Sequence, residues 1–222
     1  MMAGAETIHE VLTFVPKDYT DVIETGTFLG HATKRFADKY DTVHTIELDD
    51  KLSKFAEKGM KENGYENITC WVGDSAKILP KLISDYNKNF SDKKVLFYLD
   101  AHWSGDESVK EYKDGWSGPM SWIGNYTAHK GKDNNPTSQE QVPLEEELLG
   151  IYNNFKNECV ICVDDYDKFD EDGKGLSGVM FEAEDWSHIN LSKIFISMSD
   201  RVVDMFSVNN RLVMKLKEKN VL

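Results

Sequence analysis

The sequence of 222 residues lacks the features expected of secreted, membrane-spanning or nucleic-acid-binding proteins. Three cysteines are too few for a disulfide framework, and no basic region precedes the first apolar run, as a signal peptide would require. No apolar run approaches the roughly 20 residues that cross a bilayer. Lysine and arginine number 26 against 39 aspartate and glutamate residues, and a net charge of −13 repels phosphate backbones. We therefore expect a cytoplasmic protein with no nucleic-acid or membrane partner.

The apolar residues follow a regular pattern. Short apolar runs alternate with longer amphipathic segments, which is typical of βαβ units around a parallel sheet. Ser75 is expected to cap a helix, and Pro80 is expected to shorten or kink it. Two final apolar runs flank Asn209-Asn210, which indicates an antiparallel hairpin. The pattern predicts one α/β domain over 1–222, with strands at 21–26, 42–49, 67–74, 94–101, 158–165, 201–208 and 211–217, and helices at 6–16, 32–40, 51–63, 75–90 and 143–155.

One segment, 103–142, interrupts this alternation. It is too long for an ordinary connection, and it carries Trp103, Trp116 and Trp122. A segment of this kind is either a lid over a binding site or a disordered insert. Its aromatic residues favour the lid.

Acidic residues follow the strands at the points where ligands bind. In an open parallel sheet, ligands bind beyond the carboxyl ends of the strands. Every strand of the expected parallel set ends on an acid, whereas solubility alone would place acids at one or two of these points. The acids are Glu24, Glu47, Asp49, Asp74, Asp100, Asp164 and Asp165.

The turn after the first strand contains two glycines, Gly26 and Gly30, which allow the backbone to turn tightly and approach a ligand. The dinucleotide motif GxGxxG is absent. Glu47 stands 21 residues beyond Gly26, where a carboxylate can accept hydrogen bonds from ribose hydroxyls. The alternative for Glu47 is a solvated acid at a strand end. The two features together favour a nucleoside-binding role.

Several motifs, taken together, resemble a known family: ETGTFLG (24–30), TIELD (45–49), VGDSAKILPKL (72–82), LFYLDAHW (96–103) and VDDY (163–166). Residues 20–167 resemble class I S-adenosylmethionine-dependent methyltransferases, and most closely the metal-dependent O-methyltransferases of the catechol and macrocin type. The resemblance implies a Rossmann-like, seven-stranded, mostly parallel sheet with a C-terminal antiparallel hairpin and helices on both faces. It also implies that S-adenosylmethionine is the cofactor. In that family the glycine-rich turn contacts the methionine part of the cofactor, the acid after the second strand binds the ribose, and the GDS segment lies near the adenine. The corresponding residues here are Glu24, Gly26, Thr27 and Gly30 in the turn, Glu47 for the ribose, and Asp74 and Ser75 for the adenine.

The resemblance further implies a divalent cation, Mg²⁺ or else Mn²⁺ or Ca²⁺, with Asp100, Asp164 and Asp165 as ligands. Oxygen ligands suit these cations better than zinc. The sequence departs from the catechol enzymes at the residue after His102-Trp103, where a serine replaces their lysine base. His102 would then be a substitute base or an extra ligand, with Asp100 beside it as the second catalytic candidate. A structural histidine that bonds the loop backbone is the alternative.

The sequence therefore predicts S-adenosylmethionine-dependent methyl transfer, with a hydroxyl group of a small molecule as the acceptor. A metal-dependent hydrolase would share the acids, but it would not need Glu47 or the ETGTFLG turn. A protein that binds the cofactor without turnover would have the same sequence features. A nucleic-acid methyltransferase would be expected to show a basic face and an Asn-Pro-Pro-Tyr-like motif after the fourth strand, where LDAHW stands instead.

Overall fold

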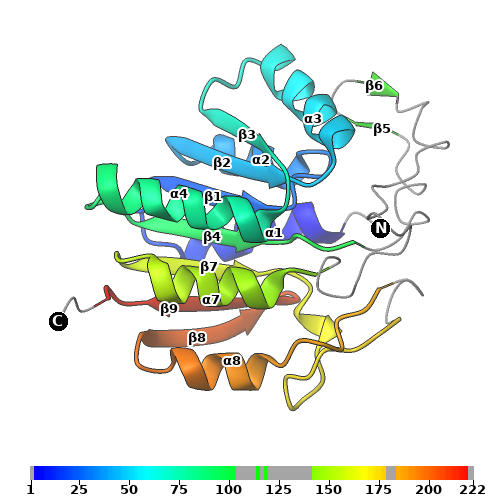
Figure 1. Cartoon of the computed structure of the whole chain (residues 1–222). Helices are drawn as coiled ribbons and strands as arrows, with labels where there is room; N and C mark the ends of the chain where they lie inside the picture. The colour runs from blue at the N-terminus through cyan, green and yellow to red at the C-terminus, as the bar shows by residue number, and fades with distance from the viewer. Residues whose placement is uncertain (1–2, 104–113, 116–117, 120–141, 179–183, 220–222) are drawn as a thin grey trace.

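A seven-stranded sheet forms the centre of the molecule in a computed structural model that describes residues 3–103, 114–115, 118–119, 142–178 and 184–219 (Figure 1). The strand order is β3-β2-β1-β4-β7-β9-β8. The first five strands of this order pair in parallel, while β9 is antiparallel to both β7 and β8. The strands are β1 (Asp21–Thr25), β2 (Thr42–Glu47), β3 (Ile68–Val72), β4 (Val95–Leu99), β7 (Cys159–Val163), β8 (Val202–Val208) and β9 (Arg211–Leu216). The predicted fold class is confirmed.

Helices cover both faces of this sheet, and each face has its own hydrophobic core. One core joins α1 and α2 to the sheet through residues such as Ile8 and Phe36, and the other joins α4, α7 and α8. Tyr98 of β4 packs in the first core and its neighbour Phe97 in the second. Burial on both faces explains why β4 is apolar throughout. The helices are α1 (Ala3–Phe14), α2 (His31–Ala37), α3 (Asp50–Glu62), α4 (Ser75–Asn89), α7 (Leu144–Asn154) and α8 (Leu191–Met198).

Helix α4 differs from its prediction at two points. Asp74 is its N-cap, because the Asp74 carboxylate accepts a hydrogen bond from the Ala76 amide, and Ser75 is the first helical residue. Pro80 lies inside α4, which continues to Asn89, so the expected shortening is wrong, while the expected kink stays a prediction. Pro80 is the sixth residue of the helix, so its missing N–H leaves the Ala76 carbonyl without the usual donor four residues later.

Helix α8 was not predicted at all. Its sequence signal is the N-cap Asn190, whose side chain accepts a hydrogen bond from the Lys193 amide. The hairpin prediction is confirmed: Asn209 and Asn210 join β8 to β9 with φ angles of 44° and 60°, as a tight hairpin turn requires. Among the described residues, no helix is long and apolar enough to cross a membrane.

The predicted lid, 103–142, lies almost entirely outside the described residues. Its described part includes two short strands, β5 (Asp114–Gly115) and β6 (Gly118–Pro119), which pair antiparallel in a separate ladder.

Candidate active site

The parallel register brings the acidic strand ends together at one edge of the sheet. Thr25 of β1 pairs with Ile46 of β2 and with Leu99 of β4, and Leu99 pairs with Val163 of β7. The residue that follows each of these therefore lies at the same edge. These residues are Gly26, Glu47, Asp100 and Asp164.

Gly26 is required by how closely the turn approaches β4. Its φ angle is +87°, and a Cβ atom placed there would lie 2.3 Å from the Asp100 carbonyl oxygen. The Gly26 amide donates to the Ile46 carbonyl oxygen at 2.9 Å, so the turn is tied to β2 as well. Gly30, with a φ angle of +80°, caps α2. The glycines of ETGTFLG thus serve tight backbone packing at the site edge.

Glu47 is buried, with 9% of its surface exposed, and is not the solvated acid of the alternative interpretation. One carboxylate oxygen accepts from the Phe28 amide at 2.8 Å and the other from the Asp49 amide at 3.0 Å. Burial raises the pKa of Glu47, and these two amides partly offset that effect. Glu47 therefore links the glycine turn to the end of β2.

Glu24 and Thr27, both in the ETGTFLG segment, are buried. Glu24 is fully buried and accepts hydrogen bonds from the hydroxyls of Thr33 and Thr45. Burial raises the pKa of Glu24 to about 8, although the two hydroxyls lower it. The Thr27 hydroxyl bonds the Thr45 hydroxyl at 2.5 Å. Glu24 and Thr27 were both predicted to contact the cofactor, and these hydrogen bonds stabilise the turn.

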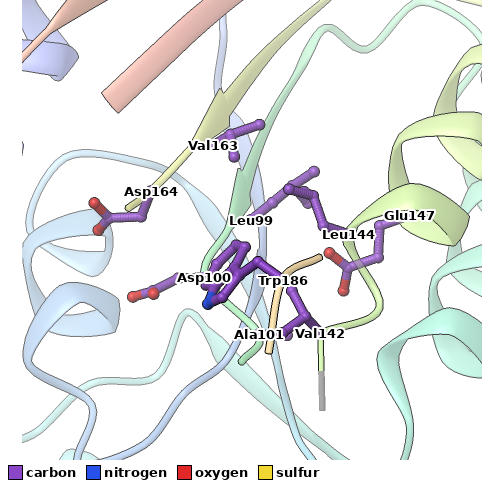
Figure 2. Close-up of a pocket in the computed structure, with 9 residues that line it drawn as sticks. All are labelled: Leu99, Asp100, Ala101, Val142, Leu144, Glu147, Val163, Asp164 and Trp186. Atoms are coloured by element: carbon purple, nitrogen blue, oxygen red, sulfur yellow. The ribbon is translucent and has the colours of Figure 1, made fainter. Parts of the chain in front are cut away.

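A buried acid that the sequence analysis missed lies next to Asp74 and Ser75. Glu147 of α7 is 1% exposed, and burial raises its pKa to about 8. The hydroxyls of Ser75 and Thr25 lower this pKa but do not outweigh the effect of burial. Its position among the buried residues Leu144, Leu148 and Ile151 of α7 is the signal that could have found it. Glu147 lines a small pocket with Leu99, Asp100, Ala101, Val142, Leu144, Val163, Asp164 and Trp186 (Figure 2).

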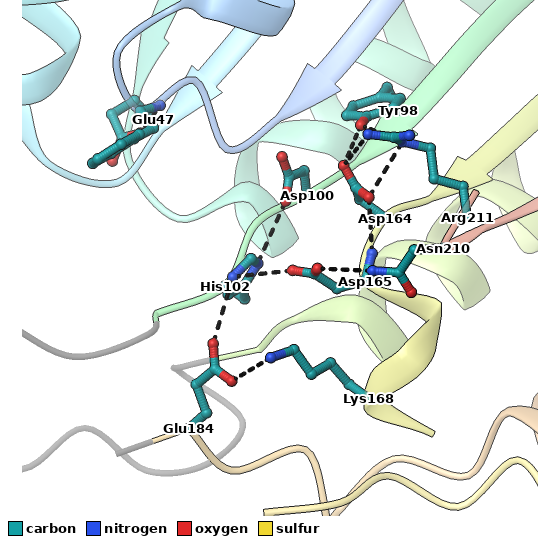
Figure 3. A network of polar contacts seen from close by, with 11 residues as sticks. Glu47, Tyr98, Asp100, His102, Asp164, Asp165, Lys168, Glu184, Asn210 and Arg211 are labelled. Carbon is teal, nitrogen blue, oxygen red and sulfur yellow. Dashed lines mark hydrogen bonds and ion pairs between the residues drawn. The ribbon is translucent and has the colours of Figure 1, made fainter. Parts of the chain in front are cut away.

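His102 connects two of the three predicted metal ligands. Its Nδ1 lies 3.4 Å from an Asp100 oxygen, and its Nε2 lies 3.3 Å from an Asp165 oxygen (Figure 3). Desolvation raises the pKa of Asp100 to about 7 and also raises that of Asp165. Burial alone would lower the pKa of His102, but the surrounding carboxylates outweigh it and raise this pKa to about 9. Within the described part of the chain, the contacts of His102 are with the side chains of Asp100, Asp165, Glu184 and Trp186.

Asp100, His102 and Asp165 form a group that could hold a metal ion, because one ligand atom from each lies within 4.8 Å of the others. The resemblance implied Asp164 in place of His102. Asp164 instead pairs with Arg211 of β9, with an Nε–Oδ1 distance of 3.2 Å, and accepts a hydrogen bond from the Tyr98 hydroxyl. Arg211 is buried and was not singled out from the sequence.

The backbone at Asp165 explains why two consecutive acids have different partners. Asp165 has a φ angle of +56°, which turns its side chain towards His102 while Asp164 faces Arg211. Non-glycine residues adopt this conformation infrequently. Asn210 of the hairpin turn holds the loop, because its side-chain oxygen accepts from the Asp167 amide at 2.6 Å.

The segment between β7 and α8 adds further groups to this cluster. The 3₁₀ helix η2 (Tyr166–Lys168) places Lys168 beside Glu184, at 2.8 Å between Nζ and Oε2. The Trp186 ring packs against His102, with 5.3 Å between the ring centroids. None of these three residues was predicted from the sequence.

Comparison with known proteins identifies the fold. No family model and no curated protein matches the sequence. A SAM-dependent methyltransferase from Aquifex aeolicus is similar in structure, at 13% identity and a TM-score of 0.50, over 96% of this chain and 88% of that one. A provisionally assigned O-methyltransferase from Klebsiella pneumoniae has 12% identity and a TM-score of 0.50, over 99% of this chain and 81% of that one. At these identities the similarity shows a Rossmann-like methyltransferase fold.

Proposed function

We propose that this protein transfers a methyl group from S-adenosylmethionine to a hydroxyl group of a small molecule, with the help of a divalent cation. The main support is the edge of the sheet at which the Gly26 turn packs on Asp100 while Glu47 lies beside it. Open α/β sheets bind their ligands beyond the carboxyl ends of the strands. The same edge here gathers the acids that a cationic cofactor and a metal ion would need.

The cofactor would lie along the glycine turn and the end of β2. Each Glu47 oxygen has two lone pairs and accepts one amide in the described structure, so the carboxylate can also accept ribose hydroxyls. Asp74 and Ser75, at the start of α4, are the proposed neighbours of the adenine. Gly26 lets the turn lie close to the end of β4, and the methionine part would pass along this turn.

A divalent cation would be held by Asp100, His102 and Asp165, whose ligand atoms already lie close together. The two carboxylates suit Mn²⁺ or Mg²⁺, and the imidazole favours Mn²⁺, the softer of the two. Asp164 would join them only if its pair with Arg211 opened. When bound, such a cation lowers the pKa of an acceptor hydroxyl and orients it.

Calorimetric titration with S-adenosylmethionine tests the cofactor assignment. Glu47→Ala is expected to weaken binding by about 2–3 kcal/mol, because it removes a charged acceptor from ribose hydroxyls and two amides. Glu57→Ala is the control, since Glu57 is an α3 acid that pairs with Lys61 away from the strand ends. Unchanged affinity in Glu47→Ala would contradict the ribose assignment.

Methyl transfer itself is tested by S-adenosylhomocysteine release with a panel of hydroxylated acceptors. EDTA is expected to abolish transfer and to leave cofactor binding largely intact, and Asp165→Asn should do the same. Full activity in EDTA would refute the metal site and leave His102 as the candidate base. Cofactor binding with no product from any acceptor would favour a protein that binds without turnover.

A further inference from the structure

Lys168 and Glu184 form a buried ion pair next to the candidate cation site. The exposed fractions of their side chains are 2% and 1%, and Nζ lies 2.8 Å from Oε2. Burying two charges carries a large desolvation cost, so such a pair is weak evidence for a role in stability alone. The placement of this pair therefore calls for another explanation.

The second carboxylate oxygen of Glu184 points towards the site. Lys168 occupies Oε2, while Oε1 is buried and has no hydrogen-bond partner within the described part of the chain. Oε1 faces His102, at 3.8 Å from Nε2 (Figure 3). A buried acceptor without a partner is uncommon and needs an explanation, and a nearby ion is one of them.

The imidazole of His102 is surrounded on several sides. Asp100 lies 3.4 Å from Nδ1, while Asp165 and Glu184 lie 3.3 Å and 3.8 Å from Nε2. Trp186 packs against the ring. These separations are long for hydrogen bonds. The ring nitrogens of His102 and the carboxylate oxygens around them therefore face one another as potential metal ligands.

We infer that Glu184, held in place by Lys168, is a positioning residue that orients His102 for a divalent cation bound by Asp100, His102 and Asp165. This inference rests on the proposed function. A metal-binding histidine commonly donates the N–H of its other ring nitrogen to a carboxylate, and that outer carboxylate fixes the ring and strengthens binding. Glu184 faces Nε2, so this role applies when His102 binds the cation through Nδ1. Lys168 prevents Glu184 from turning away, because its ammonium group holds the other oxygen.

Binding of Mn²⁺ to the full chain, followed by electron paramagnetic resonance, tests the inference without any assay of activity. Glu184→Gln keeps the shape of the side chain and an oxygen for Lys168, but it removes the charge. We expect it to weaken Mn²⁺ binding by about 10-fold or more. Affinity for S-adenosylmethionine, measured by calorimetry, should stay unchanged. Asp165→Asn should abolish Mn²⁺ binding at this site.

Glu158→Gln is the matched control, because Glu158 also pairs with lysines, Lys94 and Lys215, but lies at the opposite end of β7. It should bind Mn²⁺ as the unmodified protein does. Thermal unfolding confirms that each variant is folded at the assay temperature. If Glu184→Gln does not fold, Glu184→Asp replaces it. The shorter side chain keeps the charge but moves it away from His102, so affinity for Mn²⁺ should again fall.

The outcomes separate this inference from the proposed function. If Mn²⁺ binding is lost in Asp165→Asn but equal in Glu184→Gln and the unmodified protein, Glu184 has only a structural role and the inference is overturned. If the unmodified protein binds S-adenosylmethionine but no Mn²⁺, the metal part of the proposed function fails together with the inference. If Asp165→Asn binds Mn²⁺ normally, the cation lies elsewhere and the inference is also overturned.

Discussion

Replacing Gly26 by alanine tests whether the site edge depends on close backbone packing. The added Cβ would lie 2.3 Å from the Asp100 carbonyl oxygen and 2.7 Å from its carbonyl carbon. The Asp100 backbone cannot easily move away, because its amide donates to the Thr25 carbonyl oxygen at 3.0 Å and extends the β1–β4 pairing. Relief of the contact would have to separate the ends of these two strands.

Gly64→Ala provides a matched control. Gly64 has a φ angle of +80°, close to the +87° of Gly26, but a Cβ at Gly64 would meet nothing within 4 Å. Its substitution carries only the cost of a left-handed alanine, about 1–2 kcal/mol. Gly26→Ala carries that cost and about 1–3 kcal/mol of overpacking in addition. The expected loss for Gly26→Ala is therefore about 2–5 kcal/mol.

Urea unfolding followed by circular dichroism measures both variants. With an m value of about 2 kcal/mol/M, Gly26→Ala should have a midpoint roughly 0.5–1.5 M below that of Gly64→Ala. It should also bind S-adenosylmethionine more weakly, because the turn and the end of β4 are displaced together. Equal midpoints for the two variants would show that the contact with Asp100 is readily relieved, and would refute this account of the turn.

Three further predictions concern groups at the same edge. Burial raises the pKa of Glu147 to about 8 from an ordinary 4.5, so the folded state holds the proton more tightly and stability falls as pH rises through this range. Glu147→Gln should remove that loss, which is at most about 1.4 kcal/mol per pH unit, and urea unfolding at pH 5.5 and 7.5 measures it. Asn210→Gly keeps the turn but removes the hydrogen bond to the Asp167 amide, so it should weaken Mn²⁺ binding in electron paramagnetic resonance, whereas Asn209→Gly should not. Arg211→Met leaves the buried Asp164 carboxylate without its cationic partner and should cost about 3–5 kcal/mol in free energy of unfolding. The double variant with Asp164→Asn should recover much of this loss, and no recovery would contradict the pairing.

The backbone architecture could be predicted largely from the sequence because its signals are local. Uniform apolarity in 95–99 marks a strand buried on both faces, and the asparagines at 209–210 mark a tight hairpin. The acids after each strand marked the edge where the site lies, since parallel strands share one carboxyl edge. Helix α8 was missed, although its N-cap, Asn190, was visible in the sequence.

The partners of the acids at that edge were decided only by the tertiary structure. Asp164 and Asp165 are adjacent and chemically equal in the sequence, yet the left-handed backbone at Asp165 sends one towards His102 and leaves the other to Arg211. Arg211 is far from Asp164 along the chain and meets it because β9 pairs with β7. Local patterns of polarity determine which segments form strands and which ends carry charge. The pairing of those charges depends on backbone angles and on contacts between distant segments, which no local pattern encodes.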